Sequence, residues 1–308
     1  MTAAAAGLRY APVKAIAYGL SALASLTLLD AAVKWLTADY AVPQIAFVRY
    51  VFGLALALVL ASRMGGLATL ATRRPFGHAL RSVFNLATMI TFYFALKVMP
   101  LADTMAITFA SPLFMVGLSV VLLKEKVGWR RWAAVIIGFF GVILILQPTG
   151  AGVPSGALLA LVAAFLYALT LITSRQLSTT EPSHTILFYY SIGVLLMTGL
   201  AGLLGETELL PSWKWAPLRT ADLWIFAVVG VAGSFGQFFL NQAFRYGEVS
   251  MLAPIEYTGL LWGIFYGVVL WNEWPSWVTL AGAAVVAGSS LYIAQREARL
   301  KREDATGA

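Results

Sequence analysis

Ten long apolar runs divide this chain from end to end, and they limit what it can fold into more than any other feature. Each run holds about 18 to 24 residues, the length of helix that crosses a hydrocarbon layer about 30 Å thick. Most connections are too short to hold another element. The sequence therefore predicts an all-α integral membrane protein of ten transmembrane helices. The runs lie at residues 15–36, 43–61, 76–96, 101–123, 129–146, 153–174, 183–204, 222–244, 249–271 and 275–294.

Composition agrees with this prediction and excludes several kinds of chemistry. Hydrophobic residues make up 60% of the 308 residues and charged residues 11%, whereas about a quarter of a soluble domain is charged. The absence of cysteine excludes disulfides, zinc ribbons and thiol nucleophiles. The sequence also lacks a glycine-rich phosphate loop and a His-Glu-x-x-His motif. We therefore expect no enzymatic activity, no metal and no cofactor.

The distribution of lysine and arginine predicts how the chain lies in its membrane. The net charge is +7, and with ten spans 15 of the 21 cationic residues fall on the side of the two termini. Only Lys97, Lys214 and Arg219 fall in the opposite connections, and the other three lie within runs. Cytoplasmic connections are the ones enriched in lysine and arginine. We expect a multi-pass protein of the inner (cytoplasmic) membrane with both termini cytoplasmic, and no nucleic-acid partner.

The chain also repeats itself. A shift of 148 residues aligns residues 95–147 with 243–295 without a gap, and 11 of the 53 positions are identical. Glu125 aligns with Glu273, Trp129 with Trp277 and Gln147 with Gln295. Each half then has five spans, and because five is odd the second half crosses the membrane in the opposite sense. We expect two inverted five-helix repeats, 1–149 and 150–308, around a central cavity where a small solute binds, as in secondary transporters.

Several short motifs stand out along the two halves of the chain. They are Pro100-Leu101-Ala102, Ser111-Pro112, Leu123-Lys124-Glu125-Lys126, Ala253-Pro254-Ile255-Glu256-Tyr257 and Asn272-Glu273-Trp274-Pro275. Together they resemble the paired EamA-type repeats of the drug/metabolite transporter (DMT) superfamily. The resemblance covers nearly the whole chain and implies ten helices, cytoplasmic termini and a cavity lined by helices 1, 3, 4, 6, 8 and 9. Within the superfamily the chain is most similar to YddG-like exporters of aromatic and other amino acids.

Charged residues inside the spans are the first candidates for function, because an ionised side chain at bilayer depth requires a partner or water. Glu256 shares a helix face with Gly259 and Gly263, so it faces protein or a cavity. It either recognises a substrate amine, exchanges a proton, or makes a structural hydrogen bond. Asp30 and Lys34 stand one helical turn apart.

Two arrangements of these charges remain open. In the first, Asp30 and Lys34 form a self-contained ion pair near the outer interface; in the second, Arg49 holds Asp30 and leaves Lys34 free for a carboxylate. Arg81 is expected to be an interface anchor. For Glu273 and its repeat partner Glu125 we expect structural roles at the tight turns that end their helices.

Polar and aromatic side chains at helical spacing suggest which faces are wet. Ser234, Gln237 and Asn241 share one face of the eighth run, and Arg81, Asn85, Thr88 and Phe92 share one face of the third. Such residues either line a cavity or only join and pack neighbouring helices. The substrate-binding candidates are Glu256, Asn241, Gln237, Asn85, Thr108, Tyr257, Tyr93, Tyr167 and Trp262, and the coupling or ion-pair candidates are Asp30, Lys34 and Arg49.

The sequence thus predicts a secondary transporter that exports small metabolites, chiefly amino acids, by alternating access. The alternatives are uptake of a nucleotide-derived metabolite such as S-adenosylmethionine, or export of many drugs and metabolites. We expect a monomer or a weak homodimer whose partners are the solute and membrane lipid.

Overall fold

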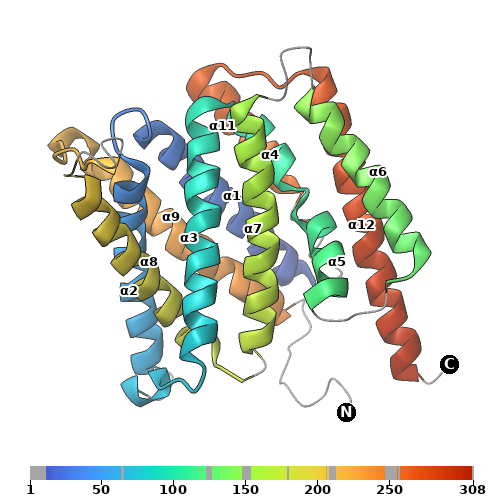
Figure 1. Ribbon diagram of the computed structural model, residues 1–308, viewed down its shortest axis with the longest axis horizontal. Coiled ribbons are helices and arrows are strands. Elements are labelled where there is room, and N and C mark those ends of the chain that lie inside the picture. The colour runs from blue at the N-terminus through green and yellow to red at the C-terminus, as the bar shows by residue number, and fades with distance from the viewer. Residues whose placement is uncertain are drawn as a thin grey trace.

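The protein is an all-helical bundle, seen here in a computed structural model (Figure 1). The structure describes residues 12–63, 66–122, 127–147, 154–178, 180–205, 207, 213–246, 255 and 257–306. Helix α1 begins and helix α12 ends on the same side of the bundle, which we call the termini end (Figure 1). The other side is called the opposite end.

The helices follow the predicted runs closely. Nine stretches of the described residues are long and apolar enough to cross a membrane, and α11 is a tenth, shorter apolar helix. The fourth stretch consists of α4 and α5 together. The helices are α1 (Pro12–Leu36), α2 (Val42–Arg63), α3 (Pro75–Val98), α4 (Leu101–Thr108), α5 (Ser111–Leu122), α6 (Trp129–Leu146), α7 (Ser155–Ser178), α8 (Ser183–Gly205), α9 (Leu223–Tyr246), α11 (Thr258–Trp271) and α12 (Trp277–Thr306), with short 3₁₀ turns at Leu67–Leu70 and Thr220–Asp222.

The packing is that of two inverted five-helix repeats. Helix α1 of the first half packs along α9 of the second, and α7 of the second half packs in the same way along α3 of the first. The remaining major pairs, α2 with α8 and α6 with α12, each join equivalent helices of the two halves. In Figure 1 these two pairs lie at the two sides of the bundle, and α1, α3, α7 and α9 lie between them.

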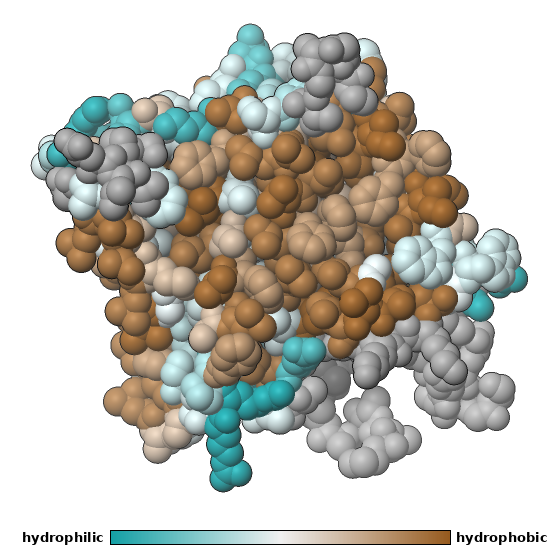
Figure 2. Space-filling view, viewed as in Figure 1, coloured by the Kyte–Doolittle hydropathy of each residue, from teal (hydrophilic) through white to brown (hydrophobic). Residues whose placement is uncertain are grey.

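The outer surface of the bundle is apolar where lipid would surround it. Figure 2 shows hydrophobic side chains across the middle of one face and hydrophilic ones toward its upper and lower edges. Helix α6, for example, exposes about half or more of Ile136, Phe140 and Ile143. Exposed apolar side chains on this scale would aggregate in water, so the surface fits a bilayer.

Helices α6 and α12 approach closely because both carry glycine at their crossing. A Cβ atom on Gly141 would lie 2.8 Å from the carbonyl oxygen of Gly282 and 3.0 Å from the Val285 side chain. We expect Gly141→Ala to lower the free energy of unfolding by about 1 to 3 kcal/mol, because overpacking forces the helices apart. Thermal unfolding in detergent measures the change.

Gly117→Ala is the matched control for this prediction. None of the described residues lies within 4 Å of a Cβ at Gly117, also a helical glycine. Since alanine favours helix over glycine by about 1 kcal/mol, this variant should be as stable as the original or more so. Equal destabilisation of both variants would contradict the close-packing explanation.

Candidate functional site

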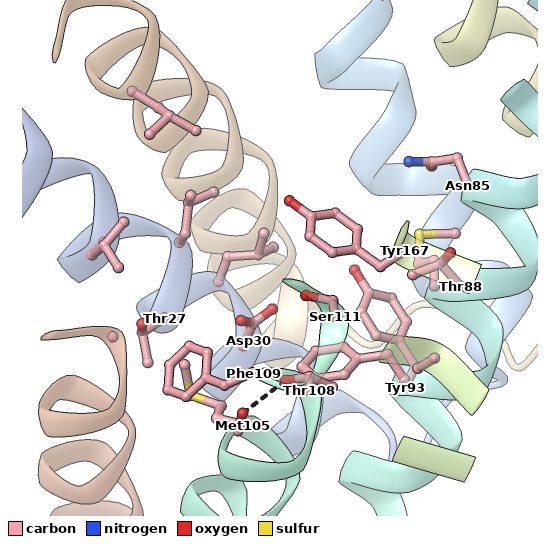
Figure 3. Close-up of a pocket in the computed structure, with 18 of the residues that line it drawn as sticks. Thr27, Asp30, Asn85, Thr88, Tyr93, Met105, Thr108, Phe109, Ser111 and Tyr167 are labelled. Carbon is pink, nitrogen blue, oxygen red and sulfur yellow. Dashed lines mark hydrogen bonds between the residues drawn. The ribbon is translucent and has the colours of Figure 1, made fainter. Parts of the chain in front are cut away.

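A cavity of about 350 Å³ lies inside the bundle, within the size range of small-molecule sites. Its wall comes from both halves: from α1, α2, α3, α4, α5, α7 and α9 and from the segment 257–259. Figure 3 shows Asp30, Ser111, Tyr93 and Tyr167 gathered around one space. The wall is largely apolar, with these groups distributed over it. The polar and aromatic lining residues are Thr27, Asp30, Arg49, Tyr50, Asn85, Thr88, Phe92, Tyr93, Thr108, Phe109, Ser111, Tyr167 and Tyr257.

Two helix ends meet at the cavity. The run 101–123 is expected to be one helix, but α4 ends at Thr108 and α5 begins at Ser111 after a turn at residues 109–110. Pro112 fits the first turn of α5, where a missing N–H is tolerated. In the second half, α11 begins directly after a turn at Tyr257. The rings of Phe109 and Tyr257 are 5.2 Å apart, edge to face. Interrupted helices at a repeat interface are where carriers bind their solutes.

Lys34 does not pair with Asp30, so the first arrangement expected for these charges is wrong. Its Nζ lies 2.6 Å from Oε2 and 2.7 Å from Oε1 of Glu273, and it donates to the carbonyl oxygen of Met99 at 2.9 Å. Glu273 also accepts the backbone N–H of Leu101 at 3.2 Å. Lys34 is therefore not left free for another carboxylate, because it is already paired with Glu273, 239 positions away in the sequence.

This ion pair lies at the opposite end of the bundle (Figure 1). It joins the end of α1, the start of α4 and the connection between α11 and α12, and thus links the two halves. The Lys34 side chain is 9% exposed and that of Glu273 26%, and the ammonium also lies 5.0 Å from the Trp271 ring centroid. We call Lys34 and Glu273 the lock. Its position agrees with a structural role for Glu273.

Asp30 lines the cavity with its carboxyl group. Among the described residues it takes part in no hydrogen bond or close ion pair, and Arg49 is the cation that acts on it electrostatically. Arg49 itself contacts two tyrosines instead of Asp30. Its Nη1 donates to the Tyr93 hydroxyl at 2.6 Å, and its guanidinium lies 5.4 Å from the Tyr50 ring centroid. The cavity therefore presents a carboxyl group and a guanidinium that are not joined directly.

Asn85 is oriented by the same cluster. The Tyr50 hydroxyl donates to Oδ1 of Asn85 at 2.8 Å, which leaves the amide N–H groups of Asn85 for the cavity side. Thr108, by contrast, donates to the carbonyl oxygen of Met105 in its own helix at 2.9 Å (Figure 3). Its hydroxyl can still accept a hydrogen bond, but its proton is already used.

Arg81 was expected to be an interface anchor, and this prediction is wrong. Its Nε donates to Ser174 Oγ at 2.6 Å, and its guanidinium lies 4.4 Å from the Tyr190 ring centroid. Its Nη1 is buried and has no hydrogen-bond partner in the part of the chain that the structure describes. The side chain thus points into the bundle, between α3, α7 and α8.

Most of the predicted site residues that can be placed lie together. Asp30, Arg49, Asn85, Tyr93, Thr108, Tyr167 and Tyr257 all line the cavity. Trp262 does not, because it lies further along α11 and stacks on Tyr266 at 6.3 Å. Glu256 and the side chains of Gln237 and Asn241 lie outside the described part of the chain.

Three polar or aromatic cavity residues, Thr27, Tyr50 and Phe109, were not singled out by the sequence. Thr27 lies three residues before Asp30 on the same face of α1, and Phe109 faces Tyr257. Thr27 could have been predicted as a cavity residue from its helical spacing to Asp30. The 148-residue register contained the signal for Phe109, because it aligns this residue with Tyr257.

The family and the named relatives that resemble this chain are all transporters. The chain matches the EamA-like transporter family twice, over residues 13–147 and 154–295. An S-adenosylmethionine uptake transporter of Rickettsia prowazekii is 28% identical over 92% of both chains. A riboflavin transporter of Rhizobium johnstonii is 28% identical over 91% of both. A solved crystal structure shares the fold, with a TM-score of 0.63 and 18% identity over 91% of this chain and 96% of its own.

Proposed function

Because the chain belongs to the EamA-like transporter family, we propose that it is a secondary transporter that exports small metabolites by alternating access. The substrates we propose are amino acids, including those with aromatic or other hydrophobic side chains. Membrane transport itself, rather than enzymatic catalysis, is what unites the family and the named relatives.

The observation that carries the choice of substrate is the charge pattern of the cavity. An amino acid has an ammonium group, a carboxylate and a side chain, and the cavity offers a matching group for each. Asp30 would face the ammonium, the Arg49 guanidinium and the Asn85 amide would face the carboxylate, and Phe92, Phe109 and Tyr257 would contact the side chain; all six line the cavity. Ionised groups of a solute at bilayer depth require polar or oppositely charged partners of this kind.

The side from which a solute reaches the cavity in this conformation rests on two further proposals. The termini end is proposed to face the cytoplasm, in line with the positive charge of its connections. We propose that the lock keeps the other end closed, so a solute would enter the cavity from the cytoplasm in this conformation. The halves 1–149 and 150–308 then rock against each other to open the lock. A single chain encloses the whole cavity, so a monomer or a weak homodimer would be competent.

Uptake of S-adenosylmethionine is the second candidate. The Rickettsia relatives are named S-adenosylmethionine uptake transporters, and this chain aligns with 92% of their length. S-adenosylmethionine has the same ammonium and carboxylate as an amino acid, together with a flat base that aromatic walls accept. Riboflavin, named for the Rhizobium and Vibrio cholerae relatives, has no such head group. A third candidate, export of many drugs and metabolites, would rely on the apolar wall alone.

Counterflow in proteoliposomes tests the proposal. Vesicles loaded with unlabelled solute take up labelled solute only if the protein exchanges the two. We expect exchange of L-phenylalanine and L-tryptophan, and none of riboflavin. Exchange of S-adenosylmethionine without amino acids would favour the second candidate, and exchange of riboflavin alone would contradict the charge argument.

A further inference from the structure

Arg81 is a partly buried cation that the proposed cavity does not explain. Its Nε is fixed by Ser174 and its face lies on Tyr190, yet its Nη1 is buried and no described residue hydrogen-bonds to it. Among the described residues no carboxylate lies within ion-pair distance of it. An unpaired N–H of a buried charged group is costly, and intramembrane arginines usually face an anion or water.

The position of Arg81 places it next to the cavity, toward the termini end. Arg81, Asn85, Thr88 and Phe92 follow one face of α3 at spacings of four, three and four, and the last three line the cavity. Figure 3 shows Asn85 and Thr88 on this helix. On α7, Ser174 lies two turns beyond the cavity residue Tyr167 in the same direction.

Arg81 is also connected to Arg49 through two tyrosine rings. The Arg49 guanidinium lies 5.4 Å from the ring centroid of Tyr50, which is 5.6 Å from that of Tyr190, which in turn is 4.4 Å from the Arg81 guanidinium. The two cations therefore follow each other along one side of the interior. A carboxylate that moves from one to the other would stay close to a positive charge at bilayer depth.

We infer that Arg81 forms a second binding station for the carboxylate of a transported solute, between the cavity and the termini end. The inference rests on the proposed function. The chemistry fits, because a guanidinium whose Nε and face are fixed still presents N–H donors in the planar geometry that a carboxylate accepts. A solute without a negative group would not bind at this station.

Binding of 3-phenylpropionate, a carboxylate with an aromatic ring and no ammonium, tests the station directly. Wild-type protein in detergent should be stabilised by this probe in a thermal-shift titration. Arg81→Gln should weaken its apparent affinity at least tenfold, because a charge-assisted hydrogen bond is lost. Arg81→Lys keeps the charge without the planar fork and should lie in between, as should Ser174→Ala, which releases Nε.

Arg74→Gln is the matched control, since Arg74 is an exposed cation at the start of the same helix. It should leave the affinity unchanged. Failure of 3-phenylpropionate to stabilise the wild type, or equal effects of the Arg74 and Arg81 variants, would overturn the station. If Arg81→Gln does not fold, the Ser174→Ala result decides. Probe binding that depends on Arg81 without any amino acid counterflow would instead overturn the proposed substrate and leave the station in place.

Discussion

Glu273→Gln is expected to open the end of the protein that the lock closes. Removal of one partner leaves Lys34 as an unpaired and nearly buried ammonium, which costs about 3 to 5 kcal/mol in the closed state. The equilibrium should shift toward conformations open at that end, and transport should fall because the cycle cannot close. Since the chain has no cysteine, a single cysteine in place of Thr27 on the cavity wall reports access. Its labelling by a membrane-impermeant maleimide from that side should accelerate at least tenfold.

Two further variants make this result specific. Arg219→Gln removes the ion pair between Arg219 and Asp39 at the same end, whose side chains are 62% and 50% exposed, and should change labelling little. The double variant Lys34→Met, Glu273→Met leaves no unpaired charge and should restore much of the closure. Unchanged labelling in Glu273→Gln would show that the ion pair does not hold this end closed.

Asp30→Asn is expected to remove recognition of the ammonium group. The half-saturation concentration of L-phenylalanine in counterflow should rise more than tenfold, because a charge-assisted contact contributes about 1.5 to 3 kcal/mol. The affinity for 3-phenylpropionate, which has no ammonium, should stay the same or improve. Asp30→Glu keeps the charge and should be affected less.

Thr108→Ala is the control inside the same cavity. Its hydroxyl proton is already donated to Met105 in its own helix, so its loss should change the half-saturation concentration less than threefold. If Thr108→Ala were as damaging as Asp30→Asn, the effect would reflect cavity shape instead of charge. If Asp30→Asn left L-phenylalanine unchanged, Asp30 would have no role in recognition.

The helices were predictable because their signal is local and strong. Run length and apolar composition placed α1 within a few residues of its observed start and at its observed end, Leu36. The turn at residues 109–110 was not predicted. Phe109 and Ala110 continue the apolar run, so hydropathy does not distinguish a helix from a turn that neighbouring helices cover.

The partners of the charged residues were harder to predict than the residues themselves. Helical spacing brings Asp30 beside Lys34, but it contains no information on Glu273, which reaches Lys34 only when α1 and the connection after α11 meet. In the same way, Arg81 lies near a helix end in the sequence, yet Ser174 and Tyr190 draw it inward. Contacts between distant segments decide which charge is satisfied and which remains available.

The exchange symmetry of the helix contacts has a thermodynamic consequence. Because α1 rests on α9 as α7 rests on α3, swapping the conformations of the two halves would rebuild similar contacts with access from the other face. Two such states would differ little in free energy, and small local differences would tune their populations. Net flux would then run down the solute's electrochemical gradient in either sense, so one architecture is suited to both uptake and efflux.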